Sequence, residues 1–408
     1  MEDILHRGGV LLHLGLILLI GYIFGNLANL FKLPRVSGYI LAGIVMSPSV
    51  LGIIDRNFLE NADVVTHASL SIITFLIGSS LSWKRVRRLG RSIAFITLGE
   101  AELAFIFVAF SMGLYLYLLG GYDPTMAVAL ALIFGSLASP TDPTATLAVI
   151  HEYRSKGILT TSVLGVSALD DATGIMNFVL GFSVALALVS GVSVDLGSVL
   201  GSVAFQVLGA VALGVLMGGV MFFLGKFAKA RKEAVTLSVG VLFFTFAVAR
   251  LLDVDDLLST MSVGVTIANL GEAWKEFEKP LENYIEDLIF TAFFVVGSAF
   301  LDLKVLISFL PLVILYVVSR FAGKFVGVYL GGSLSDAPQV VKKYLAFALF
   351  PQGGIVIGLA LLVYQNPNFK EVGSILVNVV IGATVIHELL GSVFSKLTLT
   401  KAGEIPGK

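Results

Sequence analysis

The sequence contains no cysteine and few charged residues. Without cysteine, disulfide bonds and thiolate metal sites are excluded, and the redox compartment cannot be read from the sequence. Only 13% of the 408 residues are charged and 57% are hydrophobic, whereas a soluble domain carries about 25% charged residues. Charge is expensive in hydrocarbon, so this composition is typical of a membrane protein. The formal net charge of −1 gives no reason to expect a nucleic-acid partner.

The sequence also lacks a Walker-type glycine loop, which argues against an ATP-driven pump. The first apolar segment, from Gly8 to Phe31, has neither a basic region nor a small-residue cleavage site, so we interpret it as a retained span. The chain stops soon after its last apolar segment. We therefore expect a single membrane transporter unit with no soluble regulatory domain, no nucleotide and no cofactor, acting as a secondary transporter and not as an enzyme.

Apolar segments recur along the whole chain. A membrane-spanning helix needs about 20 apolar residues, and that length predicts about thirteen spans in an all-α polytopic membrane protein. The segments lie at about 9–31, 35–53, 63–81, 92–118, 125–150, 158–190, 196–225, 234–251, 256–271, 282–300, 304–330, 342–364 and 372–395.

Lysine and arginine are distributed unevenly over the loops between these spans. One set of alternate loops carries most of the 27 basic residues, including the dense segment 84–91. Basic residues concentrate on the cytoplasmic side of a membrane. We therefore predict a multi-pass protein of the cytoplasmic (inner) membrane, surrounded by lipid, with the N-terminus outside and the C-terminus in the cytoplasm.

Two of the spans contain clusters of helix breakers in their middle. Residues 139–143 read Ser-Pro-Thr-Asp-Pro, and residues 350–354 read Phe-Pro-Gln-Gly-Gly. Proline removes a backbone donor and clashes with the preceding turn, so each helix should break into two halves. Such breaks are tolerated in a membrane beside protein or a watery cavity. Either cluster alone could be a simple kink.

The two breakers lie seven spans apart, so the helices that carry them run in opposite directions. This predicts inverted six-helix repeats at about 9–190 and 234–395, linked by the span at 196–225. Paired interrupted helices indicate the binding site of a secondary transporter. Two crossed broken helices would also aim their dipole ends at one another. The negative ends suit a cation, and the positive ends need carboxylates nearby.

Two adjacent aspartates, Asp170 and Asp171, lie well inside the span at 158–190. An ionised carboxylate there costs at least about 2.5 kcal/mol, so a structural role is hard to defend. Neighbouring carboxylates titrate in separate steps, and hard cations prefer oxygen ligands, so a proton and a cation can compete for one of them. Ser167 shares a helical face with Asp171, whereas Asp170 points about 100° away.

Basic and acidic residues in other spans are candidate partners for this pair. Arg320 and Lys324 share a helical face, and either could pair with Asp170 or snorkel to the membrane surface. Glu102 is a secondary candidate, favoured over Glu100, with an entry-vestibule or a helix-packing role equally open.

His387 and Glu388 in the last span are interpreted first as a satisfied interior pair, with a functional role as the alternative.

Several motifs together resemble those of the monovalent cation:proton antiporters, the group that contains NhaA, NapA, NhaP and the membrane domain of Kef proteins. The resemblance covers essentially the whole chain. The motifs are RVSGYILAGIVMSPSVLG at 35–52, SPTDP at 139–143, the aspartates at 170–171, FFVVGSAFLDL at 293–303, GKFVG at 323–327 and PQGG at 351–354.

This resemblance implies an NhaA-like fold and a homodimer. Each chain would have a scaffold domain and an ion-carrying core domain that moves like an elevator, and the core would include the spans at about 63–190 and 282–395. The implied Na⁺ site consists of Asp171, Asp142, Thr141 and Ser167. The implied proton and charge relay consists of Asp170, Asp171, Lys324 and Arg320, with Gln352 of the PQGG motif as a secondary candidate.

Two departures from the family pattern bear on stoichiometry. The Thr-Asp-Pro break looks like the electroneutral branch of the family, whereas the aspartate pair looks like the electrogenic branch. The PQGG motif also lacks the Arg-Gly-Glu that many relatives have at this break. The number of protons exchanged per cation is therefore open.

The function that the resemblance implies is exchange of protons for Na⁺, with Li⁺ or K⁺ as other possible cations, and a role in pH homeostasis. A K⁺/H⁺ antiporter or a Kef-like potassium efflux protein is the first alternative. A bile-acid-type symporter of organic anions, built on a similar inverted repeat, is the second, and the intramembrane acids argue against it. A sensor without ion flux is the third.

Overall fold

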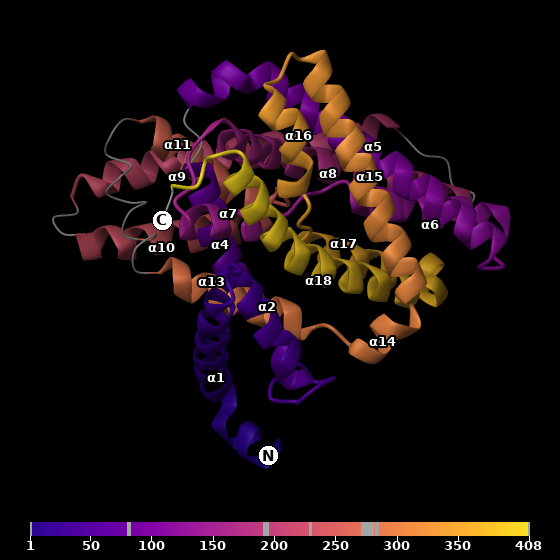
Figure 1. The fold of residues 1–408 in the computed structure, drawn as a ribbon, viewed down its shortest axis with the longest axis horizontal. Coiled ribbons are helices and arrows are strands. Elements are labelled where there is room, and N and C mark those ends of the chain that lie inside the picture. The colour runs from indigo at the N-terminus through magenta and orange to yellow at the C-terminus, as the bar shows by residue number, and fades with distance from the viewer. Residues whose placement is uncertain are drawn as a thin grey trace. The chain divides into compact units, whose positions relative to one another are not determined.

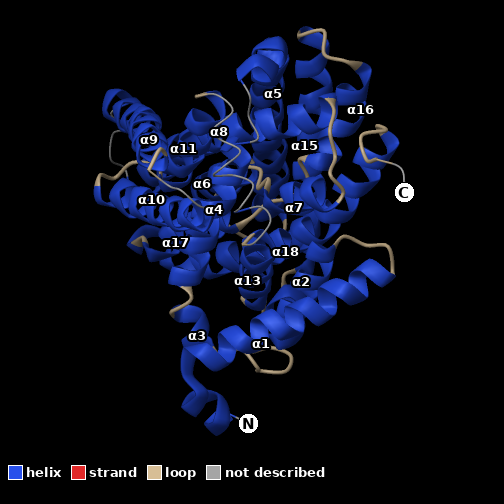
Figure 2. Ribbon diagram, turned by 90° about the vertical axis from the view of Figure 1, so that its left-hand side faces the viewer, coloured by secondary structure: helices blue, strands red, loops and turns tan. Residues whose placement is uncertain are grey.

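The structure, a computed structural model, describes residues 2–79, 83–190, 196–227, 231–270, 281 and 285–406. At some helical positions within these ranges, Asp171 among them, only the backbone is described. The described chain is all-helical, and Figure 2 accordingly draws it as helices and loops without a strand. The predicted all-α class is confirmed, and each predicted span range contains at least one helix.

Within the described residues, 7 helices are long and apolar enough to cross a membrane. Their crossing stretches are Gly9–Leu30, Leu89–Leu118, Ile158–Ser190, Ala204–Gly225, Glu233–Leu251, Leu310–Leu334 and Ile375–Lys401. Shorter apolar helices occupy several of the other predicted ranges. The number of spans, about thirteen, stays a prediction.

The chain divides into two compact units. Unit 1 comprises Met1–Arg87 and Ala204–Phe300, and unit 2 comprises Arg88–Val203 and Leu301–Lys408. The helices that lie wholly or mainly in unit 1 are α1 (Glu2–Leu30), α2 (Arg35–Met46), α3 (Arg56–Glu60), α4 (Asp63–Ser79), α9 (Leu196–Gly225), α10 (Arg231–Leu251), α11 (Asp256–Asn269) and α13 (Glu286–Ala299).

Helices α4 and α11 of unit 1 pack against each other at backbone distance. A Cβ added at Gly78 would lie 2.0 Å from the carbonyl oxygen of Met261, so the approach requires glycine at position 78. The hydroxyl groups of Thr74 and Thr260 form a 2.7 Å hydrogen bond across the same contact. This pairing of small residues with polar side chains is typical of helices that associate in a membrane.

Unit 2 carries both interrupted helices and the candidate site residues. Its helices are α5 (Trp83–Leu118), α6 (Pro124–Ala138), α7 (Thr144–Glu152), α8 (Ile158–Ser190), α14 (Leu303–Ser308), α15 (Leu310–Leu334), α16 (Gln339–Ala348), α17 (Gly354–Gln365), the 3₁₀ turn η2 (Pro367–Phe369) and α18 (Lys370–Lys401). Helices α17 and α18 run side by side in Figure 1.

Both predicted interruptions are present. Helix α6 ends at Ala138 and α7 begins at Thr144, while α16 ends at Ala348 and α17 begins at Gly354. One further division was not predicted. The range 304–330 is split between α14 and α15, with a proline in the first turn of α15, where its missing N–H costs nothing.

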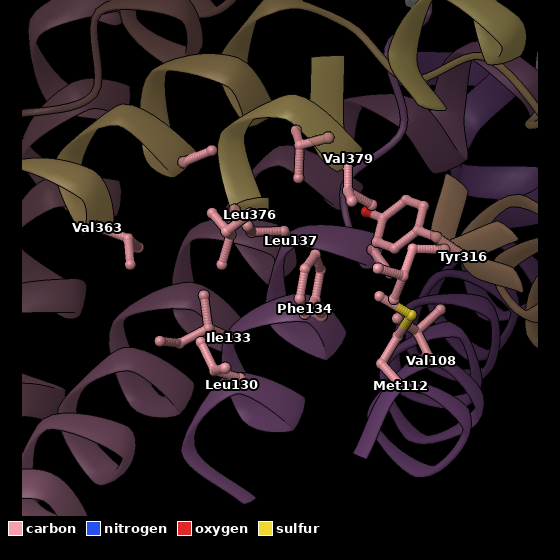
Figure 3. Close-up of a cluster of buried hydrophobic side chains, with 14 of the residues drawn as sticks. Val108, Met112, Leu130, Ile133, Phe134, Leu137, Tyr316, Val363, Leu376 and Val379 are labelled. Atoms are coloured by element: carbon pink, nitrogen blue, oxygen red, sulfur yellow. The ribbon is translucent and has the colours of Figure 1, made fainter. Parts of the chain in front are cut away.

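A cluster of buried apolar side chains holds these helices together. Figure 3 shows Val108 and Met112 of α5, Phe134 of α6 and Tyr316 of α15 in this cluster, close to side chains of α17 and α18. Tyr316 is fully buried. The cluster therefore joins helices from both predicted repeats around the interruption between α6 and α7.

Candidate functional site

The two interruptions cross at Asp142. Its backbone N–H donates a 3.3 Å hydrogen bond to the carbonyl of Pro351 in the second interruption. A Cβ added at Gly353 would lie 1.4 Å from the Asp142 carboxylate, so glycine at 353 makes room for this side chain. The carboxylate also accepts a 2.8 Å hydrogen bond from the N–H of Thr144, at the positive end of α7. Asp142 is thus the carboxylate that the positive helix end was expected to need.

Arg320 holds the carbonyl groups of both interruptions. Its guanidinium donates to the carbonyl of Ala138 at 2.9 Å, to that of Phe350 at 2.8 Å and to that of Pro140 at 2.8 Å. A fourth contact, 3.4 Å long, reaches the carbonyl of Pro351. The negative helix ends that we expected to suit a transported cation are therefore satisfied by a protein cation, because a planar guanidinium bonds several carbonyls at once.

Gln352 contributes to the same arrangement. Its amide nitrogen donates to the carbonyl of Leu137 at 2.6 Å and contacts the hydroxyl of Tyr316 at 3.0 Å. These contacts fix the second interruption against α6 and α15. Its amide oxygen is buried and has no hydrogen-bond partner among the described residues.

Lys324 uses all of its hydrogen-bond donors, and none of them goes to Asp170. The ammonium group donates to the carboxylate of Glu100, to the carbonyl of Ser139 at 2.9 Å and to the hydroxyl of Thr141 at 2.7 Å. An ammonium carries three protons, so these bonds exhaust it. Asp170 lies 3.7 Å from the Lys324 nitrogen, close enough for an ion pair but without a hydrogen bond.

The carboxylate of Asp170 has an ion pair with Lys324 but no hydrogen bond among the described residues. The side chain is completely buried, and neither of its oxygens has a hydrogen-bond partner among the described residues. The buried hydroxyl of Ser167, one turn earlier in α8, likewise has none within that part of the chain. Burial of such groups without partners is costly, and a bound proton or cation would supply the missing partner. Asp171 follows in α8, and its side chain lies outside the described residues.

Glu100 is the site residue that the sequence reasoning passed over in favour of Glu102. Glu100 is completely buried beside Lys324, whereas Glu102 is only half-buried. The cause is a glycine stripe on α15. A Cβ at Gly327 would lie 2.2 Å from the carbonyl of Gly99, so α5 meets α15 backbone to backbone at that point. Glu100, the next residue, lies in the same contact and accepts a hydrogen bond from Lys324. The GKFVG motif, which contains this lysine and two of the glycines, was the available signal.

The family model described as sodium/hydrogen exchanger, transmembrane, matches residues 15–397. The chain belongs to the sodium/hydrogen exchanger family. It is therefore a secondary transporter of the cation/proton antiport class and not an enzyme, and the sequence-based assignment to the cation:proton antiporters is confirmed.

Two curated relatives and one solved structure illustrate the relationship. Sodium/hydrogen exchanger 1 of Dictyostelium discoideum is 27% identical over 241 residues, which are 54% of this chain but only 33% of that longer protein. The ammonium/H⁺ antiporter subunit AmhT of Alkalihalophilus pseudofirmus is 22% identical over 356 residues, 85% of each chain. The sodium proton antiporter MjNhaP1 of Methanocaldococcus jannaschii has the same fold, with a TM-score of 0.74 and 19% identity over 98% of this chain and 99% of its own.

Proposed function

We propose that this chain exchanges protons for Na⁺ across the cytoplasmic membrane, with the two ions competing for Asp171. Thr141, Asp142 and Ser167 serve as further oxygen ligands, because a hard cation prefers carboxylate and hydroxyl oxygens. The observation that carries this proposal is the buried face of α8. There the Ser167 hydroxyl and the Asp170 carboxylate have no hydrogen-bond partner among the described residues. The exchange needs neither ATP nor a cofactor.

The charge balance of the cycle depends on Asp170. Lys324 donates its hydrogen bonds to Glu100, Ser139 and Thr141, and none to Asp170. The Asp170 carboxylate can therefore be stabilised by binding a proton, or by a movement of Lys324 toward it. We propose that Asp170 takes up a proton in one half of the cycle and pairs with Lys324 in the other. Such a cycle would move net charge and respond to membrane potential.

Transport would proceed by an elevator movement of the ion-carrying part of the chain relative to the scaffold, in a homodimer embedded in lipid. The orientation proposed from the basic loops places the N-terminus outside and the C-terminus in the cytoplasm.

Ammonium is a second candidate cation. The observation in its favour is the relative AmhT, which is named as a subunit of an ammonium/H⁺ antiporter and matches over 85% of both chains. Ammonium resembles K⁺ in charge and size but donates hydrogen bonds. The same buried oxygens at Ser167 and Asp170 could accept those bonds.

The test is cation-induced dissipation of a pH gradient in proteoliposomes that contain the purified chain. We expect Na⁺ to collapse the gradient, and Li⁺, K⁺ and ammonium are added in parallel to rank the cations. Protein-free liposomes measure the leak of ammonia. A response to ammonium or K⁺ without one to Na⁺ would reassign the cation. No response to any cation would contradict the proposal.

A further inference from the structure

The last helix, α18, repeats a sequence pattern of α8. In both helices a hydroxyl residue is followed four residues later by an acid, and the acid is followed three residues later by a glycine. This spacing places all three on one helical face. The two sets are Ser167, Asp171 and Gly174 in α8, and Thr384, Glu388 and Gly391 in α18. Under the inverted repeat predicted above, α8 and α18 are equivalent helices.

The two glycines contact equivalent prolines. A Cβ added at Gly174 would lie 2.7 Å from the ring of Pro140 in the first interruption. A Cβ added at Gly391 would lie 2.5 Å from the ring of Pro351 in the second interruption. Each helix therefore meets the interruption of its own repeat in the same register, and Glu388 occupies in α18 the position that Asp171 occupies in α8.

The polar atoms on this face of α18 are buried and unsatisfied. Glu388 is only 7% exposed, and neither of its carboxylate oxygens has a hydrogen-bond partner in the described part of the chain. The hydroxyl of Thr384, one turn earlier, is in the same condition. This is also the condition of Ser167, its counterpart in α8. A satisfied interior pair would have used these oxygens, so the structural interpretation of Glu388 does not explain them.

The surroundings of Glu388 suit a monovalent cation. Within the described residues, the charges of Asp142, at the crossing of the interruptions, and of Arg320 act on Glu388. Arg320 already donates to backbone carbonyls of both interruptions, so its position is fixed by those bonds. The ring of the neighbouring His387 packs edge-on against the ring of Phe350 in the second interruption, with 4.8 Å between the ring centroids. The Glu388 carboxylate and the Thr384 hydroxyl are both oxygen ligands, the kind that hard monovalent cations prefer, and both lack a hydrogen-bond partner among the described residues.

We propose that Thr384 and Glu388 form a second binding site for the transported monovalent cation, the repeat-related counterpart of the site at Ser167 and Asp171. The proposal rests on the proposed function, in which the α8 site binds that cation. The second site lies on α18, on the face whose Gly391 packs against Pro351 of the second interruption, and an ion can bind there when Asp171 is protonated.

Equilibrium binding of radioactive sodium to the purified full-length chain tests this proposal. The variants are Asp171→Asn, Glu388→Gln and the double substitution. We expect each single variant to bind about half of the sodium that the wild type binds at saturation, because each substitution removes the carboxylate of one site. The double variant should bind none. The exposed Glu233 provides a matched control, and Glu233→Gln should bind as the wild type does.

The failure of this proposal differs from the failure of the proposed function. If Asp171→Asn alone abolished sodium binding, the second site would be refuted and the α8 site would stand. If the wild type bound no sodium, the proposed function would fall with it. Thr384→Val in the Asp171→Asn background is a milder variant that keeps the carboxylate. It should weaken the remaining sodium binding several-fold, and unchanged binding would also refute the second site.

Discussion

At the scale of single residues, the hydrogen bonds of Lys324 decide how the carboxylates are arranged. Its ammonium group serves Glu100, Ser139 and Thr141, and Asp170 is left with an ion pair at 3.7 Å. Two carboxylates thus compete for one cation, and Glu100 has the hydrogen bond in this structure. Glu100 is a positioning residue that acts on Asp170 through Lys324.

The substitution Glu100→Gln should change ion affinity more than turnover. Without the Glu100 charge, Lys324 moves toward Asp170 and opposes cation binding beside it. We expect the apparent KM for the cation to rise about tenfold, equivalent to about 1.4 kcal/mol, with a smaller change in kcat. The measurement is initial exchange rate against cation concentration in proteoliposomes.

Glu233→Gln, the same change at an exposed site, is the control for this experiment. A purely structural role of Glu100 would lower the melting temperature of the variant and leave the KM of the folded protein unchanged. That outcome would contradict the competition between Glu100 and Asp170.

At the scale of elements, the contact between α5 and α15 positions the charged residues. Glycines at 323, 327 and 331 recur every four residues along α15, and a Cβ at each would lie within 2.4 Å of a backbone carbonyl of α5. Close backbone approach through small residues is a common way for helices to associate in membranes. The short distance between the helix axes brings Glu100 within reach of Lys324.

Gly327→Ala should therefore separate the two helices. Its Cβ would lie 2.2 Å from the carbonyl of Gly99, and overpacking of this kind costs about 1–3 kcal/mol. We expect a lower melting temperature together with weaker cation binding, because the Glu100–Lys324 bond stretches. Gly240→Ala is the control, since a Cβ there meets nothing within 4 Å. Equal melting temperatures for both variants would show that the α5–α15 contact is not tight.

The sequence predicts elements better than it predicts their faces. The two interruptions follow from proline clusters whose effect is local, and both are present. The choice between Glu100 and Glu102 could not be made locally, because it depends on which side of α5 meets α15. Arg320 was expected near Asp170 for its charge. It instead bonds carbonyls that only the crossing of two distant interruptions brings together.

At the scale of the whole molecule, the proposed orientation in the membrane can be tested by labelling loops from one side. The chain contains no cysteine, so single cysteines can report the side on which a loop lies. We predict that Arg56→Cys is labelled by an impermeant maleimide from outside intact cells, whereas Lys226→Cys is labelled only after the membrane is opened. Both side chains are exposed in the structure. Labelling of both from the same side would contradict the alternation of spans and the proposed inverted repeats.

In the proposed cycle, cation and proton compete for Asp171 of α8. The most direct test of this competition is the pH-gradient assay in proteoliposomes with Asp171→Asn, in protein whose folding is checked by its melting temperature. Asparagine keeps the size of the side chain but removes the charge that both ions need. We predict that the cation no longer dissipates the gradient above the rate of protein-free liposomes. Exchange at the wild-type rate in the folded variant would contradict the account.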